Sequence, residues 1–244
     1  MIYCFGDSWG YGAELDFDAG EKPFVELFDE QAKNFSVPGE GLPMITQRIL
    51  EWHHVIKKWE TVFVVIPPDT RWYTENKNVF ENLTIYTDEY PSKRYMDFIS
   101  DKTSFWFMYH ANLFVYTMQS IFDGIGCKYM FMHNYGGEFT IHRNFKKLIK
   151  VDKFLDIKNS LTTLLSSEDG FTSWQSDGPQ KVYPSVPFKS LLNHQEKVYP
   201  SVPLDVEKKG TFTGKYFEGN QTHPNQLGHY RIKELIEDAF RQRT

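Results

Sequence analysis

Two side chains near opposite ends of the chain are of the types needed for nucleophilic chemistry. Ser8 closes a Gly-Asp-Ser motif just after the apolar run 2–5, and His223 precedes the amphipathic segment 225–241. A serine hydroxyl is a weak nucleophile until a base takes its proton, and histidine is the usual base near neutral pH. The pair therefore predicts a nucleophile and its base, provided that the fold brings the two ends together.

The segments between these two residues alternate between strand and helix patterns, which favours a parallel sheet with crossover helices. The clearest strand is 61–66, because it is β-branched, unbroken and suited to burial on both faces. In such a sheet, Ser8 and His223 would reach the same ligand-binding edge. The predicted strands are 2–5, 34–37, 61–66 and 128–133, and the predicted helices are 23–31, 42–56, 105–122 and 225–241, with one or two more between 145 and 165.

These elements predict a single α/β domain over residues 1–244. It would be a three-layer α/β/α sandwich around a mostly parallel, flavodoxin-like sheet, with insertions at about 69–104 and 134–218. Within the second insertion, Lys-Val-Tyr-Pro-Ser-Val-Pro occurs at 181–187 and again at 197–203. Two short copies are too few for a solenoid, so the 181–203 repeat arm is interpreted as a surface duplication, with binding of a protein partner as the alternative.

The composition narrows the class of protein. Hydrophobic residues make up 41% of the 244 residues and aromatic residues 17%, which supplies enough apolar surface for a core. The formal net charge of −5 disfavours a nucleic-acid partner, and no apolar run has the length of a membrane span. Because the start of the chain lacks a signal-peptide pattern, we expect a soluble protein that is cytoplasmic or part of a virus particle.

Neither a metal nor a cofactor is expected. No group of His, Cys or carboxylate residues has the spacing of metal ligands. Cys4 and Cys127 lie in short apolar runs and are interpreted as buried small hydrophobic residues. His133 is expected to cap or pack at the end of its strand, with a substrate contact as the alternative, and His229 to pack or face water within the last helix.

Residues 6–10 also fit the G-x-S-x-G elbow of α/β-hydrolases, but that fold places its serine after several strands. The chain instead resembles the SGNH, or GDSL, hydrolase family. Gly6-Asp7-Ser8 is similar to the block that carries the family's nucleophile, 34–39 to its second block, and Thr222-His223-Pro224-Asn225 to the block that carries its base. The resemblance covers roughly 1–66, 105–133 and 216–244, and small virus-encoded relatives look similar.

The resemblance implies a serine esterase that acts on an acyl ester. Ser8 would attack the acyl carbonyl, His223 would move the proton, and the amides of Ser8 and Gly39 would stabilise the oxyanion. An acetylated carbohydrate is the implied substrate, because family members often deacetylate sugars and aromatic side chains at the predicted rim can stack on them. Asp7, Trp9 and Trp72 are accordingly predicted to line the substrate site.

The chain departs from the family at the residue that supports the base. Family members usually carry aspartate three residues before the histidine, whereas this chain has Asn220. An asparagine can orient the imidazole but supplies no negative charge for the imidazolium. Asn220 is therefore predicted to orient His223, and the open alternatives are a dyad without support or a carboxylate from Glu218, Asp205 or Asp177.

A second departure follows the strand at 61–66. The family supplies an oxyanion-binding asparagine there, but this chain has Asp69, Thr70 and Arg71. These three residues are predicted to flank the oxyanion, with Thr70 or Arg71 as the donor, since the Asp69 charge opposes an oxyanion. Because of both departures, the alternative function is an impaired SGNH-like binding or structural module, such as a viral particle component, that keeps the pocket without turnover.

Overall fold

The computed structural model describes residues 1–13, 15–68, 71–76, 79–83, 102–134, 138–168, 216 and 223–243. Several predicted residues lie outside these ranges. They are Asp69, Thr70, Asn220, the three carboxylates proposed as alternatives to Asn220, and the 181–203 repeat arm. The expectations attached to them stay predictions.

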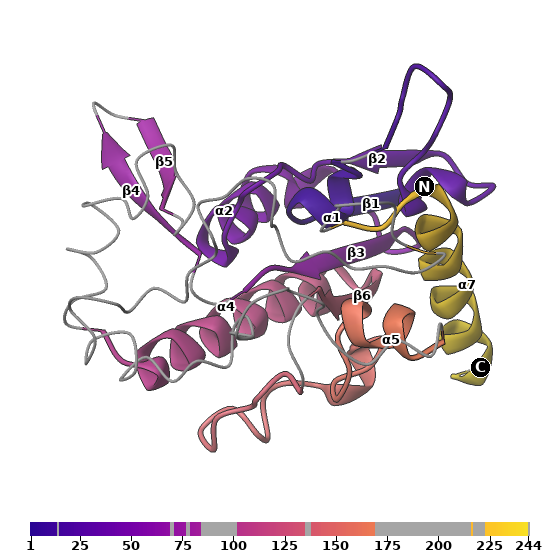
Figure 1. Cartoon of the computed structure of the whole chain (residues 1–244). Helices are drawn as coiled ribbons and strands as arrows, with labels where there is room; N and C mark the ends of the chain where they lie inside the picture. The colour runs from indigo at the N-terminus through magenta and orange to yellow at the C-terminus, as the bar shows by residue number, and fades with distance from the viewer. Residues whose placement is uncertain are drawn as a thin grey trace.

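A four-stranded parallel sheet forms the centre of the described structure (Figure 1). Its order is β2-β1-β3-β6, and each neighbouring pair is parallel. The chain leaves β1 in one direction to form β2 and then crosses back over β1 to form β3. This reversal makes the carboxyl end of β1 a topological switch point, where α/β folds bind ligands. The strands are β1 (Ile2–Phe5), β2 (Ala32–Asn34), β3 (Thr61–Ile66) and β6 (Lys128–His133).

Both faces of the sheet are buried, because successive side chains of each strand enter opposite cores. Tyr3, Val64 and Phe131 belong to a core shared with α2 (Leu42–Trp52) and α4 (Ser104–Ile125). Cys4 and Val65 belong to the other core, and the elements that cover it are η1 (Phe24–Leu27), α5 (Leu161–Glu168) and α7 (Gln226–Gln242). This confirms the predicted three-layer α/β/α sandwich.

Some of the predicted boundaries change. The helix predicted over 23–31 is only the 3₁₀ turn η1, because Phe28 is already extended with a φ of −75° and a ψ of 155°. Strand β2 ends earlier than the predicted 34–37, yet the pairing with β1 continues beyond it. The Phe35 amide donates to the Cys4 carbonyl at 2.7 Å and the Val37 amide to the Gly6 carbonyl at 2.9 Å. The predicted segment therefore does lie along the end of β1.

Helix ends follow capping chemistry. The Thr103 side chain accepts the Trp106 amide at the start of α4, and Gly126 ends the helix in a left-handed conformation with a φ of 75°. The Asn225 side chain caps α7 in the same way as Thr103. Helix α2 ends in the 3₁₀ turn η2 (His53–Val55), inside the range predicted as one helix.

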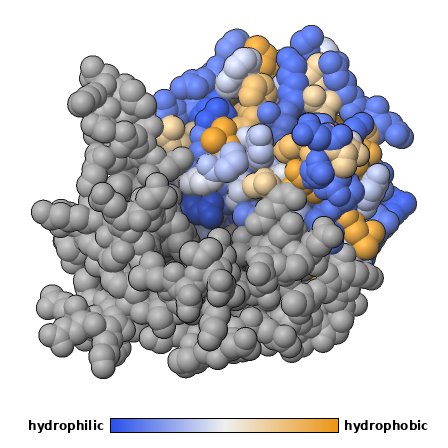
Figure 2. Space-filling view, turned by 45° about the horizontal axis from the view of Figure 1, so that its top comes forward, coloured by the Kyte–Doolittle hydropathy of each residue, from blue (hydrophilic) through white to orange (hydrophobic). Residues whose placement is uncertain are grey.

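The first predicted insertion contains a hairpin that the sequence pattern did not indicate, and the second contains α5, which overlaps the end of the range 145–165 that was predicted to hold one or two helices. An antiparallel hairpin of β4 (Trp72–Asn76) and β5 (Val79–Leu83) lies in the first, with β4 beside α2. The second begins with a long loop that includes η3 (Val151–Lys153) and leads to α5. The described surface in Figure 2 is mainly hydrophilic, with small separate hydrophobic groups. Among the described residues, none of the helices has the length and apolar character that crossing a membrane requires.

Candidate active site

The turn after β1 places Ser8 at the carboxyl edge of the sheet. Gly6 passes so close to β3 that an added Cβ would lie 2.7 Å from the Val65 Cβ. Asp7 then caps the one-turn helix α1 (Ser8–Tyr11), with its Oδ1 accepting the Trp9 amide at 3.1 Å. Ser8 is the first residue of that helix and is 5% exposed. Tight packing and a cap together hold the nucleophile candidate in place.

The start of α7 positions His223. The Asn225 amide donates to the Tyr216 carbonyl at 2.9 Å, and the Asn225 side chain accepts the Gly228 amide at 2.9 Å. Gly228 packs so closely that an added Cβ would lie 2.7 Å from the Tyr216 carbonyl oxygen. These contacts fix the backbone two residues beyond His223.

Ser8 and His223, 215 positions apart, form a hydrogen-bonded pair. The Ser8 Oγ and the His223 Nε2 lie 2.8 Å apart. The indole ring of Trp9 flanks the imidazole, with the ring centroids 6.4 Å apart and the planes inclined by 59°. The distance is within hydrogen-bond reach of a serine and its general base. The structure therefore brings together the two residues that the sequence predicted as nucleophile and base.

Beneath this pair, Asp7 is the centre of a buried ionic network. Its carboxylate is 0% exposed, and its Oδ2 accepts from Arg71 Nη1 at 2.6 Å and from Asn134 Nδ2 at 2.8 Å. The three residues come from the end of β1, the segment after β3 and the residue after β6. Buried charges need this kind of partner, because an isolated carboxylate is costly to desolvate. The network ties three parts of the sheet edge to the residue before Ser8.

Sequence reasoning missed Asn134 and assigned Asp7 and Arg71 different roles. Asn134 directly follows the strand predicted at 128–133, so its position at the active edge was a usable signal. Asp7 is wholly buried, so it cannot line a substrate site as predicted. Arg71 was predicted as an oxyanion donor, but its Nη1 donates to Asp7. Gly41 packs against the Arg71 backbone, where an added Cβ would lie 2.4 Å from the carbonyl oxygen.

The two tryptophans predicted to line the substrate site have other surroundings. Trp9 is 0% exposed, so it offers no ring face for a sugar to stack on. Trp72 packs against three aromatic side chains of α4. Its ring centroid lies 4.8 Å from that of Trp106, 5.7 Å from that of His110 and 5.6 Å from that of Phe114. Trp9 is therefore closed to a sugar, whereas the place of Trp72 in a substrate site stays a prediction.

Gly39 lies in a tight turn whose start is tied to the end of β1. The Glu40 amide donates to the Val37 carbonyl at 3.2 Å, and Gly39 has a φ of 83°, which favours glycine. The Glu40 carboxylate pairs with Arg48 of α2. Among the described residues, the amides of Ser8 and Gly39 make no hydrogen bond. Both amides thus keep their donor capacity.

The described residues offer no stronger nucleophile or metal centre. Burial raises the pKa of the Cys4 thiol to about 12 and that of Cys127 to about 11, so both stay protonated near neutral pH. Both are free and buried, as predicted. Within the described ranges, no group of three or more His, Cys, Asp or Glu side chains is arranged to hold a metal ion.

Two further histidines are structural. His133 is buried, and its Nε2 lies 3.1 Å from the Asp156 carbonyl oxygen. His229 lies inside α7 and is wholly buried, with its Nδ1 accepting the Phe24 amide at 3.1 Å. Burial, and secondarily the nearby His223, lower the pKa of His229 to about 3. A proton on Nδ1 would also break the hydrogen bond from Phe24, so His229 stays neutral.

Mild acid is expected to destabilise the fold through His229. Unfolding returns its pKa from about 3 to the ordinary 6.5, so the unfolded chain binds more protons between these values. The free energy of unfolding therefore falls as the pH falls below 6.5, by about 1.4 kcal/mol per pH unit. Urea denaturation at pH 7.5 and at pH 5 should differ by about 2 kcal/mol.

The variant His229→Asn tests whether His229 causes the acid sensitivity. The asparagine Oδ1 can accept the Phe24 amide, but the side chain does not titrate. The variant should remove most of the difference between the two pH values. His54→Asn, at an exposed position, is the control and should keep the difference. An equal difference in wild type and His229→Asn would show that other groups cause the acid sensitivity.

The chain is similar to known proteins at the level of structure. No family model matches the chain, and no curated protein matches it in sequence. Among solved structures, it is similar to the crystal structure of a member of the lipolytic protein G-D-S-L family from Veillonella parvula. The identity is 12%, the alignment covers 98% of this chain and 97% of that chain, and the TM-score is 0.40. A likeness at this level defines neither the site nor its activity.

Proposed function

We propose that the chain is a serine ester hydrolase in which Ser8 is the nucleophile and His223 the general base. The 2.8 Å contact between the Ser8 Oγ and the His223 Nε2 carries this proposal. It is supported by the place of the pair at the switch point of a parallel sheet, where α/β folds bind ligands. The sequence resemblance to SGNH hydrolases points to the same chemistry.

The reaction would proceed in two half-reactions. The Ser8 Oγ attacks the acyl carbonyl carbon while the His223 Nε2 takes the hydroxyl proton, and the same nitrogen returns that proton to the departing alcohol. A water molecule, deprotonated by His223, then attacks the acyl-enzyme and releases the acid and free Ser8. Orientation of the imidazole by Asn220 remains a prediction from the sequence.

The oxyanion would be held by the amides of Ser8 and Gly39. Both amides lack a hydrogen bond within the described part of the chain, so neither has to be released before the oxyanion forms. Donors that are already oriented stabilise developing charge without reorganisation. The Asp7, Arg71 and Asn134 network acts as support, since it holds the residue before the nucleophile and touches no reacting atom.

Hydrolysis of a small acetyl ester tests the proposal directly. Wild type should release acetate from p-nitrophenyl acetate faster than Ser8→Ala, and a fluorophosphonate should label wild type at Ser8 but leave Ser8→Ala unlabelled. Thermal denaturation of both proteins checks that the variant is folded. Equal hydrolysis rates together with no labelling of wild type would remove the esterase proposal and favour a binding module without turnover.

A further inference from the structure

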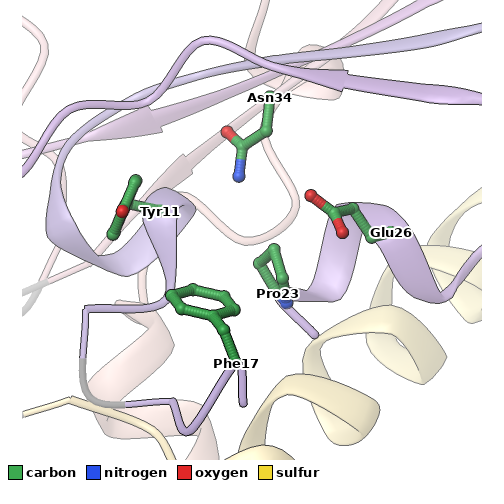
Figure 3. A pocket seen from close by; sticks show the side chains of 5 residues that line it. All are labelled: Tyr11, Phe17, Pro23, Glu26 and Asn34. Atoms are coloured by element: carbon green, nitrogen blue, oxygen red, sulfur yellow. The ribbon is translucent and has the colours of Figure 1, made fainter. Parts of the chain in front are cut away.

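A small pocket lies beside the end of α1 (Figure 3). Its volume is about 260 Å³, and it is formed by the end of α1, the following loop, η1 and the end of β2. Figure 3 shows the rings of Tyr11 and Phe17 on one side and the Glu26 carboxylate directed inward from the opposite side. The remaining lining residues are Pro23 and Asn34.

The walls of the pocket are continuous with the elements that carry the Ser8–His223 pair. Tyr11 lies three residues after Ser8 on α1, and residues with this spacing share one face of a helix. Next to the lining residue Pro23, the Lys22 amide donates to the Gln226 Oε1 at 2.5 Å, and the Gln226 Nε2 donates back to the Lys22 carbonyl at 3.1 Å. Gln226 follows His223 by three residues. The pocket is thus built on segments that are joined to those carrying Ser8 and His223.

The rings of the pocket are exposed and form a corner. Tyr11 is 41% exposed and Phe17 is 47% exposed, and their planes meet at 78° with centroids 5.8 Å apart. A flat sugar ring stacks on a single ring face, whereas a corner of two rings surrounds a compact group. The negative face of an aromatic ring attracts a cation, and quaternary ammonium groups are commonly bound by such rings.

The charge around the pocket points to a cation as well. Residues 14–30 contain seven acidic residues against the single Lys22, a formal net charge of −6, whereas the whole chain carries −5. Within the described part of the chain, the Glu26 carboxylate makes no hydrogen bond or ion pair. A carboxylate facing two rings in a negative field offers a cation a counter-charge and raises its local concentration.

We propose that this pocket binds a positively charged alkylammonium group, carried by the alcohol part of the ester that Ser8 cleaves. The claim that the ammonium group belongs to the ester rests on the proposed esterase function. The claim that the pocket binds an alkylammonium group does not. Tyr11 and Phe17 contact the methyl groups of the ammonium, and Glu26 supplies the opposite charge. An ester of an amino alcohol is thus preferred over its uncharged counterpart.

Calorimetric titration with choline tests the binding without depending on catalysis. The Ser8→Ala chain should bind choline about tenfold more tightly than 3,3-dimethylbutan-1-ol, in which carbon replaces the charged nitrogen. Adding Glu26→Gln should lower the preference for choline over the neutral alcohol, because only the rings then attract the cation. Glu30→Gln is the matched control, because it removes the same charge from the same acidic segment at an exposed position outside the pocket lining.

Hydrolysis of acetylcholine and 3,3-dimethylbutyl acetate by the wild-type chain separates the two proposals. A kcat/KM ratio of about ten in favour of acetylcholine, lowered by Glu26→Gln but kept by Glu30→Gln, would support both. Tight choline binding with no hydrolysis of either ester would leave the cation pocket but remove its link to the ester that Ser8 cleaves, and the p-nitrophenyl acetate and labelling experiments would then decide the esterase function by themselves. The cation pocket would be overturned if choline and the neutral alcohol bound equally tightly. It would also be overturned if Glu26→Gln and Glu30→Gln lowered the affinity for choline equally, whatever the hydrolysis rates.

Discussion

Replacing His223 with alanine should lower kcat for ester hydrolysis by about 10⁴-fold or more, because the Ser8 hydroxyl then lacks a base. Residues that act as one unit are strongly non-additive. A further Ser8→Ala change in the His223→Ala background should therefore cost almost nothing. Steady-state hydrolysis of p-nitrophenyl acetate by the two single variants and the double variant measures this.

The control for this experiment is His54→Ala, which removes an exposed imidazole from η2 and should keep the wild-type rate. Free imidazole at millimolar concentration should restore part of the activity of His223→Ala, because it can enter the vacated space, but should do nothing for Ser8→Ala. If the factors by which Ser8→Ala and His223→Ala lower kcat multiply in the double variant, Ser8 and His223 do not act as nucleophile and base of one step.

Arg71→Met is expected to destabilise the fold by about 3–5 kcal/mol, because it leaves the Asp7 carboxylate buried without its counter-charge. Asn134 Nδ2 and the Trp9 amide would remain as neutral donors to that carboxylate. Since Asp7 precedes Ser8 and caps its helix, the nucleophile should also shift. A misplacement on the order of 1 Å can cost about 10²-fold in rate. Urea denaturation measures the loss of stability, and kcat measured at 15 °C, with circular dichroism to check that the variant is folded, measures the effect on the rate.

Arg231→Met is the matched control, because it removes an arginine of α7 that pairs at 2.7 Å with Glu234, whose side chain is 58% exposed. Such surface pairs contribute about 0–1 kcal/mol. In Asp7→Asn/Arg71→Met no charge is buried, so this double variant should be more stable than Arg71→Met alone. If Arg71→Met and Arg231→Met are equally stable, the Asp7 network does not hold the turn before Ser8.

Strands β3 and β6 could be predicted from the sequence alone. The predicted bounds 61–66 and 128–133 are those of β3 and β6. A strand that is buried on both faces forms a continuous apolar run, and such a run can be recognised in the local sequence. Ser8 and His223 were also predictable, since each lies next to an element with a clear pattern. The helix predicted over 23–31 was wrong, because Phe24 and Phe28 are spaced like a helix face but belong to one 3₁₀ turn and the extended residue after it.

What the sequence by itself determined is therefore the layered α/β/α fold and the two side chains that meet at its edge. Only the tertiary structure decided what surrounds them. Asp7, Arg71 and Asn134 are up to 127 positions apart, and no local pattern relates residues at such separations. The same holds for the burial of Trp9 and for the corner of Tyr11 and Phe17 opposite Glu26. Periodicity records which face of an element is apolar, whereas the partner of a polar or aromatic side chain depends on how the elements pack.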